Sequence, residues 1–270
     1  MRALSWNLYH GRDFPPDPTL HTWRSRLLRR TELGPTHAQV NRSLVDEFAA
    51  WFERREWDVA LLQEAPPRWL RPLASRARAS GALALTSRNF LPAVRGRLAD
   101  CNPDLIASNE GGSNQLLVRH PGRIAGLRRL TLTRLPERRR MLLAHLDTPS
   151  GRVCVANLHA TAGRPEAAAR EVEVAAECAL EWAREDPLLF GGDFNLRPRR
   201  EPEPFARLRE RFSLCCPTGL DAIDHLLARG LSVIEPPRRL EPEERELAGP
   251  QGLRLRLSDH APVIALFGMR

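Results

Sequence analysis

Short apolar runs that stop at a polar side chain recur along this sequence. One run covers residues 2–6 and stops at Asn7, and another covers residues 58–63 and stops at Glu64. Runs of this length without helical spacing predict buried β-strands. Between them, from Val40 onward, apolar residues recur at helical spacing, so this part of the chain predicts a strand–helix–strand unit.

The middle of the chain predicts antiparallel pairing. Several strand-like runs follow one another there without a helical pattern between them, and the turn at residues 148–151 predicts a hairpin that ends at His159. The runs are 115–119, 124–133, 141–147 and 153–158.

Helical and strand patterns alternate in the remaining segments. Proline suits the first turn of a helix, and Pro66 and Pro165 open segments that predict helices to about residues 79 and 185. A predicted strand at residues 188–190 leads into the glycine pair 191–192. We expect further strands at 222–227 and 262–267, and loops at 197–204 and 235–249.

The composition is that of a packed globular protein. Hydrophobic residues make up 42% and charged residues 27% of the 270 positions, close to the globular average and unlike a disordered chain. No linker or repeat is evident, so we expect residues 1–270 to form a single α/β domain. No apolar run reaches the roughly 18 residues that span a bilayer, and the amino terminus lacks a signal-peptide pattern. A cytoplasmic protein with reduced cysteines is therefore expected.

The net charge of +8 suits a polyanionic partner such as nucleic acid. All 41 basic residues are arginines, however, which a GC-rich coding bias also produces, so charge alone does not identify the partner. Two arginine clusters could contact a substrate backbone or could simply be solvated faces. They are Arg197, Arg199 and Arg200, and Arg24, Arg26, Arg29 and Arg30.

Polar side chains at the predicted strand ends form the candidate site. Asp193 and Asn195 follow the glycine pair, and their alternate positions point both to one side. On their own they are equally compatible with an Asx turn. Asp259 and His260 stand just before the last predicted strand. In layered α/β folds, sites assemble at the ends of such strands.

Six short motifs, taken together and in chain order, resemble the endonuclease/exonuclease/phosphatase superfamily of deoxyribonuclease-like, metal-dependent phosphoesterases. The resemblance spans nearly the whole chain and implies a four-layer α/β sandwich, in which two packed mixed β-sheets are flanked by helices. The motifs are Leu4-Ser5-Trp6-Asn7, Leu61-Leu62-Gln63-Glu64, Asn157-Leu158-His159, Gly192-Asp193-Phe194-Asn195, Ile223-Asp224-His225 and Ser258-Asp259-His260-Ala261-Pro262-Val263.

The resemblance also implies a metal site. It makes Asn7 and Glu64 part of that site and Asp259 a further ligand. Oxygen ligands of this hardness suit Mg²⁺ or Mn²⁺.

Catalytic roles follow from the same resemblance. Asp193 is implied to orient or deprotonate the attacking water, and Asn195 and His159 to bind phosphoryl oxygens. His260, oriented by Asp224, is implied to contact the scissile phosphate. His225 is expected to be a packed histidine without a role.

The leading hypothesis is a Mg²⁺- or Mn²⁺-dependent phosphodiester hydrolase, most simply a monomeric nuclease of low sequence specificity acting on nucleic acid. His159 stands where abasic-site endonucleases usually carry a tyrosine-containing segment, which argues against that specialised activity. The alternatives are a phosphatase or lipid phosphodiesterase acting on a small substrate, and a binding protein that has lost catalysis. The intact acidic and histidine residues argue against the last alternative.

Overall fold

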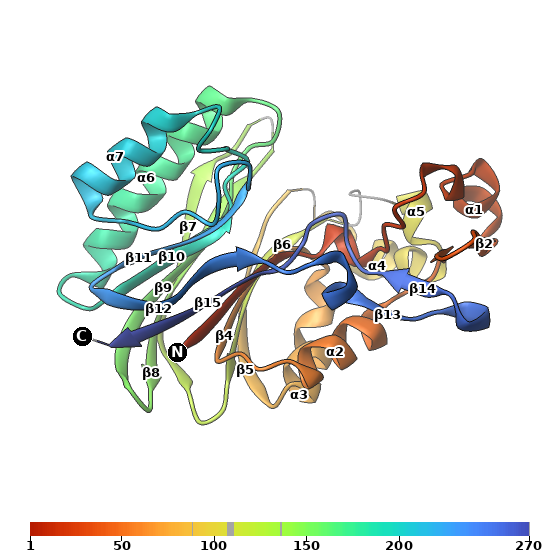
Figure 1. The fold of residues 1–270 in the computed structure, drawn as a ribbon, viewed down its shortest axis with the longest axis horizontal. Helices are drawn as coiled ribbons and strands as arrows, with labels where there is room; N and C mark the ends of the chain where they lie inside the picture. Colours follow the sequence, from red (N-terminus) through yellow and green to blue (C-terminus); the bar gives the residue numbers. More distant parts are fainter. Residues whose placement is uncertain (88, 107–110, 136, 270) are drawn as a thin grey trace.

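Two mixed β-sheets pack face to face in the computed structural model, which describes residues 1–87, 89–106, 111–135 and 137–269 (Figure 1). The first sheet has the order β12 (Leu231–Arg239), β15 (Val263–Met269), β1 (Arg2–Asn7), β4 (Val59–Ala65), β6 (Ser113–Arg119) and β5 (Ala79–Leu85). The second has the order β11 (Asp224–Arg229), β10 (Leu188–Asp193), β9 (Gly151–His159), β8 (Arg139–Thr148) and β7 (Arg123–Thr133).

Helices cover the outer face of each sheet. α2 (Val45–Arg54) and α3 (Leu70–Arg76) pack on the first sheet, and α6 (Pro165–Ala183) and α7 (Pro202–Phe212) pack on the second (Figure 1). Successive strand residues point to opposite faces, so Trp6 of β1 packs under α2 whereas Ala3 faces the other sheet. The protein is therefore a four-layer α/β sandwich, as the family resemblance implied.

A group of short elements extends beyond the sandwich, and we call it the arm. Figure 1 shows α1 and β2 at its far end. Pairing between β2 and β3 and between β13 and β14, and contacts of α1 with α5, link its parts. The arm consists of α1 (Trp23–Leu28), β2 (Glu32–Leu33), β3 (Ala38–Gln39), α4 (Pro92–Cys101), α5 (Pro103–Ile106), β13 (Glu246–Ala248) and β14 (Arg254–Arg256).

Three predicted segments need correction. The helix expected to reach residue 79 ends at Arg76, and β5 begins three residues later. The expected loop at 235–249 contains most of β12 and all of β13, and the expected loop at 197–204 contains the start of α7. β5 and β12 are the two edge strands of the first sheet, where one side of the strand has no neighbour and the apolar pattern is weaker.

Candidate active site

The predicted site residues meet where strands of both sheets end. In the second sheet, the strand register pairs Asp193 with His159 of β9 and with Asp224 of β11. In the first sheet, Asn7 ends β1 next to Glu64 of the parallel strand β4. The Asn7 side chain joins the two sheets, because its Nδ2 donates to Asp193 Oδ2 at 3.0 Å.

Backbone irregularities direct two of these carboxylates. Gly192 has φ +134°, and a Cβ there would lie 1.9 Å from Leu158 O. Only glycine therefore allows β10 to lie this close to β9 just before Asp193. In β4, the register shifts after Leu62, and Glu64 has φ +47°. Such a bulge re-aims a side chain, and here it is Glu64 that is re-aimed.

Asp193 is the centre of the cluster. Its Oδ1 accepts the backbone N–H of Asn195 at 3.0 Å. Its Oδ2, besides the bond from Asn7, lies 3.5 Å from His159 Nε2 and 4.0 Å from His260 Nε2. Burial, together with the neighbouring Asp224 carboxylate, raises the pKa of Asp193. A buried carboxylate with a raised pKa is a stronger base than an exposed one.

Asp224 and His260 form a direct pair. His260 Nδ1 lies 2.8 Å from Asp224 Oδ2. Burial opposes the charged imidazolium, but the contact with Asp224 outweighs it and raises the pKa of His260 well above its usual value. The pair therefore presents a protonated Nε2 toward Asp193 and the site.

Hydrogen bonds to β1 and to Arg245 hold the segment that carries Asp259 and His260. The Trp6 indole donates to His260 O at 2.9 Å, and Arg245 Nη1 donates to the same oxygen at 2.6 Å and to Ser258 O at 2.8 Å. Ser258 Oγ donates to Asn7 O at 2.7 Å. Arg245 was not predicted, because an arginine in a Glu- and Arg-rich segment carries no distinguishing signal.

His159 is a neutral donor in this site. Burial and the adjacent Arg139 guanidinium lower the pKa of His159 to about 3. Arg139 Nη1 donates to His159 Nδ1 at 3.4 Å, so the ring hydrogen is on Nε2, which lies between Asp193 and Glu64. Arg139 was also missed, since it belongs to a run of arginines.

Glu64 has a second imidazole neighbour that the sequence did not indicate. His10 Nε2 lies 3.2 Å from Glu64 Oε2, and His159 Nε2 lies 3.8 Å from Glu64 Oε1. Burial raises the pKa of Glu64, but the neighbouring imidazoles, His260 among them, and a hydrogen bond from Asn7 outweigh it and hold the value below the usual range. His10 follows Asn7 by three residues in an irregular turn, so no periodic pattern could have revealed it.

The donor set fits a divalent cation. Glu64 and Asp259 form no ion pair with an arginine in the described ranges, and burial and the Glu64 charge raise the pKa of Asp259. Two such carboxylates with the Asn7 amide oxygen could hold a hard cation, which would relieve their repulsion. Asp193, Asp224 and His260 also lie within ligand distance of one another. In that group, however, Asp224 Oδ2 and His260 Nδ1 are already bonded to each other.

The remaining predicted residues lie nearby or elsewhere. Asn195 Nδ2 donates to Ala160 O at 3.0 Å, and His225 is fully buried with Nε2 3.1 Å from Leu196 O. Arg199 is paired with Asp221 at 3.0 Å. The arginines of residues 24–30 lie on and just after α1 in the arm.

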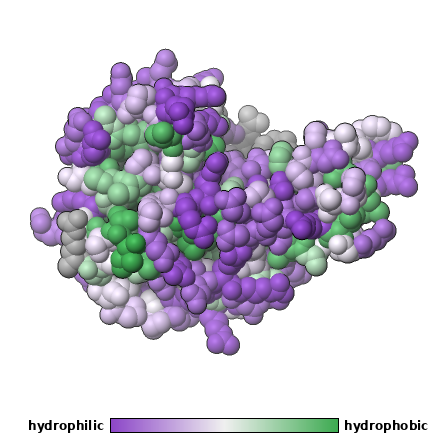
Figure 2. Space-filling view, viewed as in Figure 1, coloured by the Kyte–Doolittle hydropathy of each residue, from purple (hydrophilic) through white to green (hydrophobic). Residues whose placement is uncertain are grey.

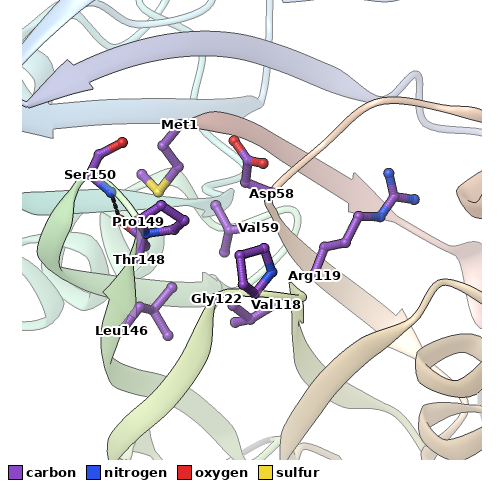
Figure 3. A pocket seen from close by; sticks show the side chains of 11 residues that line it. Met1, Asp58, Val59, Val118, Arg119, Gly122, Leu146, Thr148, Pro149 and Ser150 are labelled. Carbon is purple, nitrogen blue, oxygen red and sulfur yellow. Dashed lines mark hydrogen bonds between the residues drawn. The ribbon is translucent and has the colours of Figure 1, made fainter.

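A separate pocket of about 120 Å³ lies at the opposite ends of the strands. Figure 3 shows Met1, Val59 and Leu146 lining it, with Asp58 and Arg119 at its side. Asp58 accepts the Arg2 N–H, and Arg119 donates to backbone carbonyls. The pocket therefore offers no cluster of reactive groups.

The model of the Endonuclease/Exonuclease/phosphatase family matches residues 4–260 of this chain. The chain belongs to this family. Its members are hydrolases that act on phosphoric ester bonds, so this family member is a phosphoesterase by descent. No curated protein sequence matches the chain.

Solved structures share the fold of this family member at low identity. An endonuclease/exonuclease/phosphatase family protein from Bacteroides thetaiotaomicron is 14% identical, with a TM-score of 0.66, over 100% of this chain and 95% of that one. A mannosyl-6-phosphatase from Bacteroides thetaiotaomicron VPI-5482 is 14% identical, with a TM-score of 0.66, over 99% of both chains. D. rerio TDP2 complexed with single-strand DNA product is 14% identical, with a TM-score of 0.61, over 100% and 99%.

Among the residues that the structure describes, no helix is both long enough and apolar enough to cross a membrane.

Proposed function

We propose that this protein is a divalent-metal-dependent phosphodiester hydrolase, and specifically a nuclease of low sequence specificity that works with Mg²⁺ or Mn²⁺. The observation that carries the proposal is the contact of Asp193 with Asn7, His159 and His260, backed by the Asp224–His260 pair. This arrangement places a base and several hydrogen-bond donors around one small volume, as in-line attack by water on a phosphoester requires.

Each residue has a distinct task in this mechanism. Asp193 orients the attacking water and accepts its proton. The Nε2–H groups of His159 and His260 donate to phosphoryl oxygens as negative charge grows on them. Asn195 adds a further donor, because an amide carries two hydrogens and one of them bonds Ala160 O.

The bound cation would be held by Glu64, Asp259 and the Asn7 amide oxygen, and its chemistry there is to polarise the phosphoryl group. His10 and His159 keep the Glu64 carboxylate oriented and ionised.

Nucleic acid is the proposed substrate because the chain is strongly cationic and a fold relative has been solved with DNA. The net charge is +8, and the D. rerio TDP2 structure contains single-strand DNA product. The proposal includes no base-specific contact, so cleavage should depend little on sequence.

A small phosphorylated substrate is the second candidate, and one contact favours it. Arg199 is engaged by Asp221, which leaves fewer cationic groups beside Asn195 to follow a nucleic-acid backbone. The mannosyl-6-phosphatase with the same fold shows that the fold accommodates such chemistry.

A substrate panel separates the two candidates. Purified protein with Mg²⁺ or Mn²⁺ is assayed on plasmid DNA, single-stranded RNA, a generic phosphodiester and sugar phosphates. The nuclease proposal expects nucleic acid to have the highest kcat/KM, with a steep loss of apparent affinity as salt rises. Hydrolysis of sugar phosphates alone would overturn it in favour of the second candidate.

A further inference from the structure

Helix α1 exposes the side chains that a helix usually buries. Trp23, Leu27 and Leu28 are 62%, 60% and 56% exposed. Residues four apart lie on one helix face, so Trp23 and Leu27 form an apolar ridge. Arg24 and Arg26 flank this ridge on either side, and Arg29 and Arg30 follow the helix directly.

The surrounding fold holds α1 firmly in place. Thr22 caps its start by accepting the Ser25 N–H, and Asn41 Nδ2 donates to Ser25 O at 2.7 Å. Asn102 Nδ2 donates to Arg26 O at 2.8 Å, and its Oδ1 accepts from Asn41 at 2.8 Å. A six-residue helix does not form on its own in water. The buried amides of Asn41 and Asn102 therefore stabilise a helix whose apolar ridge is exposed.

The arginines of α1 carry unneutralised charge. Within residues 1–87, 89–106, 111–135 and 137–269, no ion pair involves the four arginines of this segment, and Arg24 only stacks on Trp23. The nearest acid in sequence, Glu32, accepts from the Thr22 hydroxyl. Figure 2 shows hydrophobic and hydrophilic surface side by side at this end of the molecule. The exposed side of α1 is therefore apolar along Trp23 and Leu27, with cationic side chains on both sides of this ridge.

We propose that the exposed face of α1 docks on the surface of an anionic lipid bilayer. Trp side chains prefer the headgroup level, leucines insert at the boundary with the acyl chains, and arginines bind lipid phosphates at the rim. The face contains none of the residues assigned to the active site, so the inference goes beyond the proposed function and does not depend on it.

Other occupants fit this face less well. A second copy of the chain would bring two sets of four arginines together, and like charges across an interface are unfavourable. Nucleic acid would satisfy the arginines and could stack on Trp23. It offers no apolar surface for Leu27 and Leu28, however. A bilayer satisfies all three side-chain types.

Trp23 provides a direct readout. It is the most exposed of the six tryptophans, since Trp6, Trp51, Trp57 and Trp69 are buried and Trp182 is half-buried. Vesicles of phosphatidylglycerol and phosphatidylcholine should co-sediment the full-length protein and shift its tryptophan emission to the blue. Pure phosphatidylcholine vesicles should do neither, and Trp23→Phe should bind the anionic vesicles without the shift. Absence of both binding and shift with anionic vesicles overturns the proposal.

Paired variants test the two halves of the face. Arg24→Gln/Arg26→Gln should lower the partition coefficient about 25-fold, at roughly fivefold for each arginine near an anionic surface. Leu27→Ser/Leu28→Ser should lower it at least about tenfold, from lost apolar burial. The matched controls Arg209→Gln/Arg211→Gln on α7 and Val174→Ser/Leu220→Ser should leave it nearly unchanged. Thermal unfolding checks that each variant is folded.

The remaining outcomes are decisive as well. Equal losses in the controls would show non-specific binding and overturn the proposal. A blue shift produced by a short DNA duplex but not by vesicles would assign the face to nucleic acid. Dimerisation in sedimentation velocity that is abolished by Leu27→Ser/Leu28→Ser would assign it to a second copy of the chain.

Discussion

At the strand ends, polar side chains are buried and bonded to one another, whereas on the arm apolar side chains face solvent. Asp193 is 1% exposed, and both its oxygens accept hydrogen bonds from other site residues. Trp23 is 62% exposed. In the first region the fold stabilises groups that would be costly to bury without partners. In the second it leaves uncovered groups that would gain from being buried. Chemistry is thus expected at the strand ends and contact with a partner on the arm.

The largest effect should come from Asp193→Asn. The change is nearly isosteric but removes the base, so kcat on the best substrate should fall by about 10²-fold or more, while substrate binding persists. The arm variant Leu27→Ser should hydrolyse a small soluble diester at the parental rate. If Asp193→Asn kept the parental kcat, Asp193 would not be the base, and the strand ends would not be the place of the chemistry.

Metal binding should show the next largest effect. Glu64→Gln removes a charged oxygen ligand, so Mn²⁺ affinity measured by calorimetry should fall. Loss of a residue that only contacts a metal ligand typically lowers metal affinity roughly 10- to 100-fold, and loss of Glu64 itself should cost at least as much. His10→Ala should lower it within that range, because the His10 contact orients Glu64. Glu32→Gln in the arm is the matched control. An unchanged titration in Glu64→Gln would contradict the metal assignment.

The same contrast explains what the sequence could predict. The strands that carry Asn7, Glu64, His159 and Asp193 lie inside the sheets, so they have strongly apolar patterns that end abruptly at a polar residue. Their ends define the site, and the motif resemblance supplied the Asp224–His260 pair.

Edge strands and the arm were much harder to predict. β5 is built from small residues and resembles a continuation of the preceding helix. β12 contains Pro236 and Pro237, which edge strands tolerate. The arm depends on contacts between distant segments, such as Asn41 with Asn102, and no local pattern encodes these. His10 was missed for the same reason, since its partner Glu64 is distant in sequence, whereas Arg139 was missed because it stands in a run of arginines.

Two buried side chains, one in each region, should affect the pH dependence of stability in opposite ways. At the base of the arm, burial raises the pKa of Asp13 to about 8, although its carboxylate accepts the Val40 N–H at 2.9 Å. The folded state thus keeps a proton that the unfolded state loses near pH 4. The resulting stabilisation is complete below about pH 4 and is lost as pH rises through 8. Asp13→Asn should flatten this decline, by up to about 4 kcal/mol, in chemical denaturation between pH 5 and 8.

His225 in the sandwich should give the opposite slope. Burial lowers its pKa to about 4, so its contribution is complete above about pH 6.5 and is lost as pH falls through 4. His225→Gln should flatten the stability curve on this acid side only. A parental protein whose stability rises monotonically from pH 5 to 8 would contradict the assignment of Asp13.

The smallest effect should be on the salt dependence of nucleic-acid binding. It should distinguish the arginines beside the site from those of the arm. If nucleic acid follows the surface past Asn195, Arg197 and Arg200 each contact a phosphate, and replacing both by Ala should lower the slope of log affinity against log salt by about two. Arg199 stays in place because Asp221 already pairs with it. Arg24→Gln/Arg26→Gln should leave the slope unchanged, because a face built for lipid contributes no phosphate contact to DNA. A lower slope in both variants would extend the nucleic-acid surface onto the arm. An unchanged slope in both would mean that substrate contact is confined to one phosphoryl group, and the small-substrate function would then be favoured.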